Sequence, residues 1–163
     1  MASVRTTRTV YLPSDPRTAA QFRSSGRLDR GEGISADDAY ARRRDLDPAV
    51  PDDEEEADYW ALTDAGLAGL AAAEGPRFVI AVRARPEQIV AAGPDGSGRV
   101  SVADVAWSQV SALFIDEAEA LPAVAAARAA LADPDAFAER TAALVTAHDL
   151  LWYAPEELDA LLG

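Results

Sequence analysis

The chain has 163 residues, 49% of them hydrophobic, and its 28 acidic residues against 15 arginines give a net charge of −13 at pH 7. This is the length of one domain, and the absence of cysteine excludes disulfide frameworks, zinc ribbons and thiol catalysis. The negative charge argues against a nucleic-acid partner, because phosphate binding needs a positive surface. With no apolar run long enough for a membrane span and no signal-peptide core in residues 1–9, we predict a cytoplasmic protein that does not bind membranes.

The first half of the chain predicts one strand followed by three helices. A weak alternation of apolar residues predicts a strand over residues 7–12, and Ser14 is the expected cap of a helix that ends near Gly26. A second helix is predicted over residues 36–46. Glycine, serine, proline and charged residues predict loops at 24–34 and 47–52, and residues 1–6 a flexible N-terminus.

The third helix has the clearest signals. It is predicted from Asp53 to Ala73, with Asp52 as its cap, acidic residues in its first turn where the helix dipole favours them, and Gly75-Pro76 as its stop. Its apolar face makes it a main packing element.

The second half alternates strands and helices in a less regular way. Strands are predicted over residues 78–84, 89–92, 99–102, 110–115 and 150–153, with a helical turn at 104–109 and helices at 122–131, 135–147 and from Pro155 onward. Runs of helices separated from runs of strands favour an α+β fold. We therefore predict a single domain over residues 1–163, with a mixed, mostly antiparallel sheet covered by helices.

Two acidic residues are candidates for metal binding. Asp116 and Glu117 follow a predicted strand directly, a place where carboxylates often bind Mg²⁺ or act as general acids. The alternative is that they precede the helix at Pro122, where negative charge is favourable. His148, the only histidine, is expected at a helix C-terminus, where a histidine commonly interacts with the last carbonyls.

Acidic and aromatic side chains are the candidates for partner binding. Residues 51–163 hold six arginines and 21 acidic residues, a net charge of −15, so this part must form an extended negative surface. Its densest stretch includes Glu54, Glu55 and Glu56. Trp107, Trp152 and Tyr153 are aromatic residues of the kind that interfaces favour as anchors.

Several segments together resemble a known family. They are Val10-Tyr11-Leu12-Pro13, Glu54-Glu55-Glu56 with Tyr59 and Ala61-Leu62, Val79-Ile80-Ala81, Asp116-Glu117 with Pro122-Ala123-Val124, and residues 148–154. The pattern resembles a family of small acidic actinobacterial proteins, a domain of unknown function. The resemblance implies a cytosolic protein and assigns no catalytic residue; where that family has Glu after the histidine, this chain has Asp149.

The leading hypothesis is a non-catalytic protein-binding or regulatory module without a cofactor, because no nucleophile or cofactor motif occurs. Its partner is expected to be a protein with a basic contact surface. The alternative is a small metal-assisted hydrolase or transferase that uses Asp116 and Glu117. A third possibility, an acidic mimic of nucleic acid, would need its acids spaced like phosphates on one face.

Overall fold

The computed structural model describes residues 7–163, so the flexible terminus expected at residues 1–6 lies outside the described residues. The strands are β1 (Arg8–Pro13), β2 (Arg27–Ile34), β3 (Phe78–Ala84), β4 (Ile89–Ala91), β5 (Arg99–Ala106), β6 (Val110–Ile115) and β7 (Leu151–Tyr153). The α-helices are α1 (Pro16–Ser25), α2 (Asp38–Arg42), α3 (Pro51–Ala68), α4 (Leu121–Ala129), α5 (Pro134–Ala147) and α6 (Leu158–Leu161). Short 3₁₀ turns lie at Gly69–Ala71, Pro86–Gln88, Trp107–Gln109, Ala118–Ala120 and Pro155–Glu157.

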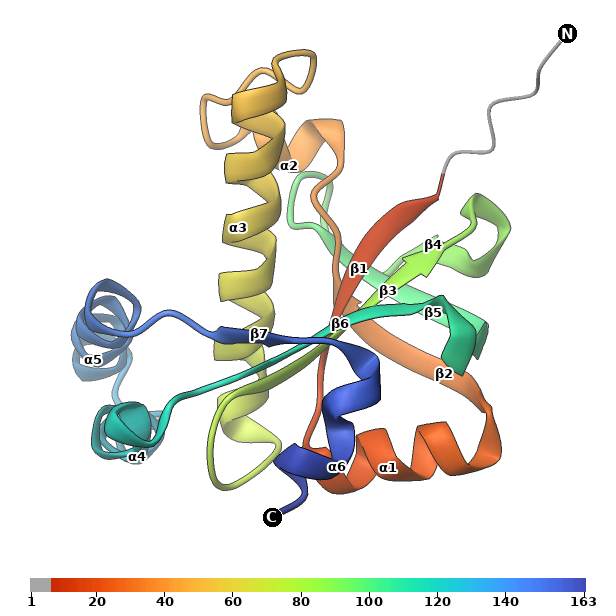
Figure 1. Ribbon diagram of the computed structural model, residues 1–163. Coiled ribbons are helices and arrows are strands. Elements are labelled where there is room, and N and C mark those ends of the chain that lie inside the picture. The colour runs from red at the N-terminus through yellow and green to blue at the C-terminus, as the bar shows by residue number, and fades with distance from the viewer. Residues whose placement is uncertain (1–6) are drawn as a thin grey trace, which may run out of the picture.

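All seven strands of the described part form one sheet, in the order β4-β5-β2-β1-β3-β6-β7. Every pairing is antiparallel, which confirms the α+β class and corrects the expectation of a mixed sheet. The connection between β1 and β2 shows the reason. A helix that carried the chain back along the full length of the sheet would make the two strands parallel. Helix α1 instead lies across their lower ends, so the chain returns in the opposite direction (Figure 1).

Strand β2 occupies a segment that the sequence predicts to be a loop. Its partner is β5, with which it pairs from Arg27 to Ile34. The glycines that suggested a loop serve close packing instead, since a Cβ on Gly33 would lie 2.3 Å from the carbonyl oxygen of Tyr11 in β1. The absence of a side chain therefore lets β2 lie against β1.

Helices cover both faces of the sheet, as Figure 1 shows. Helices α1 and α6 cover one face, and the first core cluster there includes Val10, Leu12, Phe22, Ile80, Leu113 and Leu158. Helices α2 and α3 cover the other face, and the second core cluster includes Tyr11, Ile34, Tyr40, Ala61, Val79 and Ala112. A third cluster, of Leu70, Ala120, Val124, Ala127 and Leu144, joins α4 and α5 to the end of α3.

Local signals place most helix ends correctly. Helix α1 ends at Gly26, which has a φ of 77°, and α5 begins after the Asp133 cap with Pro134 in its first turn. Two helix caps differ from the prediction, those of α1 and α3. The cap of α1 is Asp15, whose carboxylate accepts from the Thr18 N–H at 2.9 Å, in place of Ser14.

Helix α3 begins earlier and ends earlier than predicted. Its cap is Val50, which makes no side-chain cap hydrogen bond, because Pro51 takes the first helical position and moves Asp52 inside the helix. The α-helix ends at Ala68, and the chain continues as the 3₁₀ turn Gly69–Ala71. No helix among the described residues is both long and apolar enough to cross a membrane.

Candidate functional site

The edge strand β7 exposes a tryptophan. The side chain of Trp152 is 60% exposed, and its register partner in β6 is Phe114. Phe114 packs against the second core cluster and makes an edge-to-face contact with Tyr11, at 6.4 Å between ring centroids. Since residues opposite each other on paired strands share a face, Trp152 lies on the side of the sheet that carries α3.

The chain that enters β7 passes alongside α3 (Figure 1). The Tyr59 hydroxyl on α3 donates to the Asp149 carboxylate at 3.0 Å, and Leu150 lies against Gly66 of the same helix. Tyr59 is 41% exposed, and Glu55 lies one turn before it on the same face of α3. We call the set Glu55, Tyr59, Asp149 and Trp152 the α3–β7 surface.

The three glutamates of the predicted binding stretch point in different directions. All are exposed, but Glu54 faces a cavity beside β1, Glu55 belongs to the α3–β7 surface, and Glu56 accepts from the Trp60 indole N–H at 3.4 Å. This divergence follows from the helix, which rotates the side chain by about 100° per residue.

The two other aromatic candidates lie apart from the α3–β7 surface. Tyr153 pairs with Leu113 and packs on the first core cluster, on the opposite face of the sheet from Trp152. Trp107 packs edge-to-face on Phe22 of α1, at 5.2 Å between ring centroids, on the same cluster. Adjacent residues of a strand point to opposite faces, so Trp152 and Tyr153 cannot serve one flat contact together.

The acidic pair after β6 is bound within the protein. The Asp116 side chain is 0% exposed, and its Oδ1 accepts from the Arg77 guanidinium at 2.7 Å, while its Oδ2 accepts from the Arg77 backbone N–H at 2.7 Å. Arg77 also donates to the carbonyl of His148 at 3.0 Å, so the pair ties β6 to the end of α5. The Asp116 carboxylate thus balances a buried cation of the chain itself.

Glu117 contacts the histidine that the sequence analysis singled out. Its Oε1 lies 3.1 Å from His148 Nδ1, and the His148 backbone N–H donates to the Leu144 carbonyl as the end of α5. No group of three or more His, Cys, Asp or Glu side chains in residues 7–163 has the arrangement of a metal site. Asp116 and Glu117, adjacent in sequence, therefore contact different basic groups.

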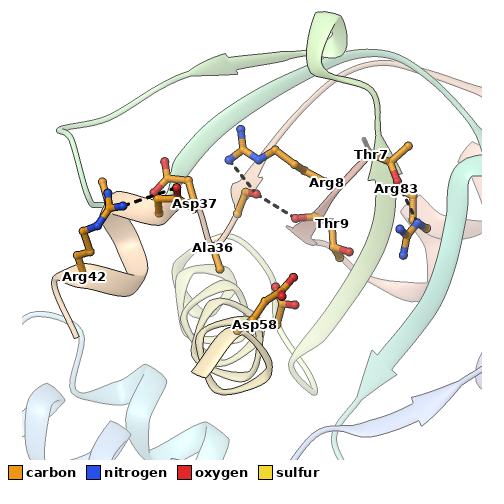
Figure 2. Close-up of a pocket in the computed structure, with 12 residues that line it drawn as sticks. Thr7, Arg8, Thr9, Ala36, Asp37, Arg42, Asp58 and Arg83 are labelled. Carbon is orange, nitrogen blue, oxygen red and sulfur yellow. Dashed lines mark hydrogen bonds and ion pairs between the residues drawn. The ribbon is translucent and has the colours of Figure 1, made fainter. Parts of the chain in front are cut away.

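A cavity with a volume of about 730 Å³ lies where β1 and β3 meet α2 and α3 (Figure 2). Arg8 and Arg83 line it from the strands, and Glu54 and Asp58 line it from α3. Hydrogen bonds hold both guanidinium groups: Arg8 donates to the Ser35 hydroxyl at 3.1 Å, and Arg83 donates to the Thr7 hydroxyl at 3.2 Å. The cavity walls thus carry charges of both signs.

One carboxyl group in this cavity is destabilised in its charged form. Burial raises the pKa of Asp58, the nearby Glu54 raises it further, and Arg83 lowers it. Burial, with a smaller contribution from Asp58, also raises the pKa of Tyr11, which belongs to the second core cluster. The ionised Asp58 is therefore held at a cost to folding.

Replacing Asp58 by asparagine is expected to raise stability at neutral pH. A pKa raised by folding means that the ionised aspartate opposes folding above its unfolded-state pKa, and asparagine removes this penalty. The gain should vanish as the pH falls below the ordinary range of aspartate pKa values, where the carboxyl is protonated in both states. Thermal melts of both proteins from neutral to acid pH measure it; a lower melting temperature for Asp58→Asn at neutral pH would contradict it.

Of the charged residues that line the cavity from β1, β3 and α3, only Glu54 was a candidate from the sequence, as part of its acidic stretch. Arg8, Arg83 and Asp58 belong to three elements that only the fold brings together, and none stands in a recognisable motif. The sequence held a signal for Arg83. It is the single charged residue of β3, a strand that is otherwise apolar on both faces, and it is also the single exposed residue there.

The pattern of segments noted in the sequence is that of a defined family. A model described as a family of unknown function, DUF6912, matches residues 8–162. The chain belongs to this family. The match begins at the first residue of β1 and ends after α6, so the sheet and all its covering helices are parts of the DUF6912 domain. No curated protein and no solved structure matches the chain.

Proposed function

We propose that the protein is a non-catalytic protein-binding module whose α3–β7 surface binds an extended basic segment of a partner protein. The observation that carries the proposal is the exposed Trp152 on an edge strand, on the sheet face that carries α3 and three residues after Asp149, which Tyr59 of α3 contacts. A strand at the edge of a sheet leaves one row of backbone N–H and C=O groups for pairing, and extended segments commonly bind by adding a strand there.

The charge around this edge favours a basic partner. Between Arg44 and Arg77 the chain has ten acidic residues and no basic one, and this stretch includes all of α3. From Thr141 to the C-terminus it has four acidic residues and no arginine or lysine. A lysine or arginine of the partner would meet carboxylates beside aromatic faces, an arrangement that favours cations both by charge and by cation–π attraction.

Loss of the Trp152 side chain is expected to weaken partner binding while the fold is kept. Tryptophan side chains at the centre of interfaces commonly contribute 2 kcal/mol or more, so Trp152→Ala should weaken partner binding by at least about tenfold. Because the side chain is largely exposed, the melting temperature should stay close to that of the wild type. The matched control is Val90→Ala, since Val90 is 66% exposed on β4, the opposite edge strand.

The measurement compares the three immobilised proteins. A partner from host lysate should be retained by the wild type and by Val90→Ala and lost by Trp152→Ala, and the purified partner should then associate more slowly as salt rises and with Glu55→Gln. Equal retention by the wild type and Trp152→Ala, or an association rate independent of salt, would contradict the proposal.

A further inference from the structure

In the cavity beside β1 and β3, the carboxylates of α3 and the arginines of the strands stay apart, whereas the lining pair Asp38 and Arg42 of α2 forms an ion pair at 3.8 Å. Figure 2 shows Asp58 on α3 facing the strand ends that carry Arg8, Thr9 and Arg83. Among residues 7–163 no ion pair joins Glu54 or Asp58 to either arginine, although Arg83 is close enough to lower the Asp58 pKa. Carboxylates and guanidinium groups that face each other across an open space can both bind a ligand that has one positive and one negative group.

The positive wall is fixed in place before any ligand binds. The Ser35 hydroxyl, in a residue only 2% exposed, accepts from Arg8 and donates to the Thr9 carbonyl at 3.0 Å, so it links the Arg8 side chain to the backbone of the next residue in β1. The Thr7 hydroxyl holds Arg83 through its Nε. A guanidinium has five N–H donors, and each of these contacts uses one of them, so further donors of each arginine remain for a ligand. Side chains that are already ordered lose less entropy on binding.

The negative wall is ordered by its helix. Glu54 and Asp58 are one turn apart on α3 and therefore share a face. Asp58 remains half-buried although its charged form is disfavoured there. A ligand cation placed between these two carboxylates would reduce that penalty, because a nearby positive charge stabilises the ionised form of a partly desolvated acid.

We propose that this cavity binds a small zwitterion of the amino-acid class, with its carboxylate on Arg8 and Arg83 and its ammonium group on Glu54 and Asp58. The volume of about 730 Å³ is within the range of about 300–1,000 Å³ typical of small-molecule sites. Arginine is the residue best suited to carboxylate, since its planar group donates two parallel hydrogen bonds. The site is distinct from the α3–β7 surface: Glu54 and Asp58 line the cavity beside β1 and β3, whereas Tyr59, one turn after Glu55, contacts Asp149.

The test titrates the ¹⁵N-labelled full chain with zwitterions of increasing charge separation, namely glycine, 4-aminobutanoate and 6-aminohexanoate. Butanoate and butylamine are the matched compounds with a single charge. At least one zwitterion should shift the amide signals of Thr9, Ser35, Asp58 and Arg83 and bind at least about tenfold more tightly than either single-charge compound, because only the zwitterion makes charge-assisted contacts with both walls.

Variants separate the two walls. Asp58→Asn should reduce the affinity for the zwitterion toward that of butanoate, and Arg83→Gln should reduce it toward that of butylamine. Arg17→Gln, on the exposed side of α1, removes the same charge away from the cavity and should leave the affinity unchanged. The proposal is overturned if no zwitterion binds tenfold more tightly than the single-charge compounds, if the shifts fall outside the cavity, or if Arg17→Gln weakens binding as much as Arg83→Gln.

Discussion

Replacing Asp116 by alanine is expected to lower the free energy of unfolding by about 3–5 kcal/mol, the cost of leaving a buried charge without its partner. The Arg77 side chain is 2% exposed, and in the native protein both Asp116 oxygens accept hydrogen bonds from it or from its backbone. Once the carboxylate is gone, the guanidinium keeps only the His148 carbonyl as a partner. Urea unfolding followed by circular dichroism measures the loss.

The control for this prediction is an exposed ion pair of similar length. Arg23 and Asp159 also lie 2.7 Å apart, but their side chains are 35% and 78% exposed. Asp159→Ala should therefore cost no more than about 1 kcal/mol, because water and salt screen exposed charges. Equal urea midpoints for Asp116→Ala and Asp159→Ala would contradict the prediction that the buried pair stabilises the junction between β6 and α5.

Leu70→Ala is expected to destabilise the protein by about 2–5 kcal/mol, the usual cost of removing a fully buried leucine. Leu70 is 1% exposed and lies in the third core cluster, where the end of α3 meets α4 and α5. Leu67, on the same helical segment, is only partly buried against that cluster, so Leu67→Ala should cost clearly less.

The comparison of the two leucines tests which side of the α3 segment supports the core. Leu67 and Leu70 are three residues apart, a spacing that places both on one face of a helix, but only Leu70 is fully buried. Chemical denaturation of both variants beside the wild type decides the point. A larger loss for Leu67→Ala than for Leu70→Ala would contradict the arrangement of the third cluster.

The sequence predicted the elements whose signals are local. The run Phe78–Ala84, apolar on both faces, is a central strand, and the Asp133-Pro134 pair starts α5 at the expected place. Asp38 lies four residues before Arg42, a spacing that predicts an ion pair on a helix, and the pair forms at 3.8 Å. Such signals can be read directly because cause and effect lie within a few residues of each other.

Strand β2 could not be predicted in the same way. Its sequence, RLDRGEGI, has charged residues and two glycines, which taken alone indicate a loop. Its strand conformation depends on β5, about 70 residues later, and on the close approach of Gly33 to Tyr11. Propensity is a weak guide when the pairing partner supplies the hydrogen bonds.

The sequence by itself determined the acidic character, the α+β class and the candidate residues; the tertiary structure alone decided which of those residues act together. It joined Tyr59 to Asp149 across 90 positions and Arg77 to Asp116 across 39, and it separated Trp152 from its neighbour Tyr153. It also placed Arg83 opposite Asp58 around one cavity. The reason is that composition and periodicity report on neighbours along the chain, whereas a binding site is made by side chains that meet only after the sheet has formed.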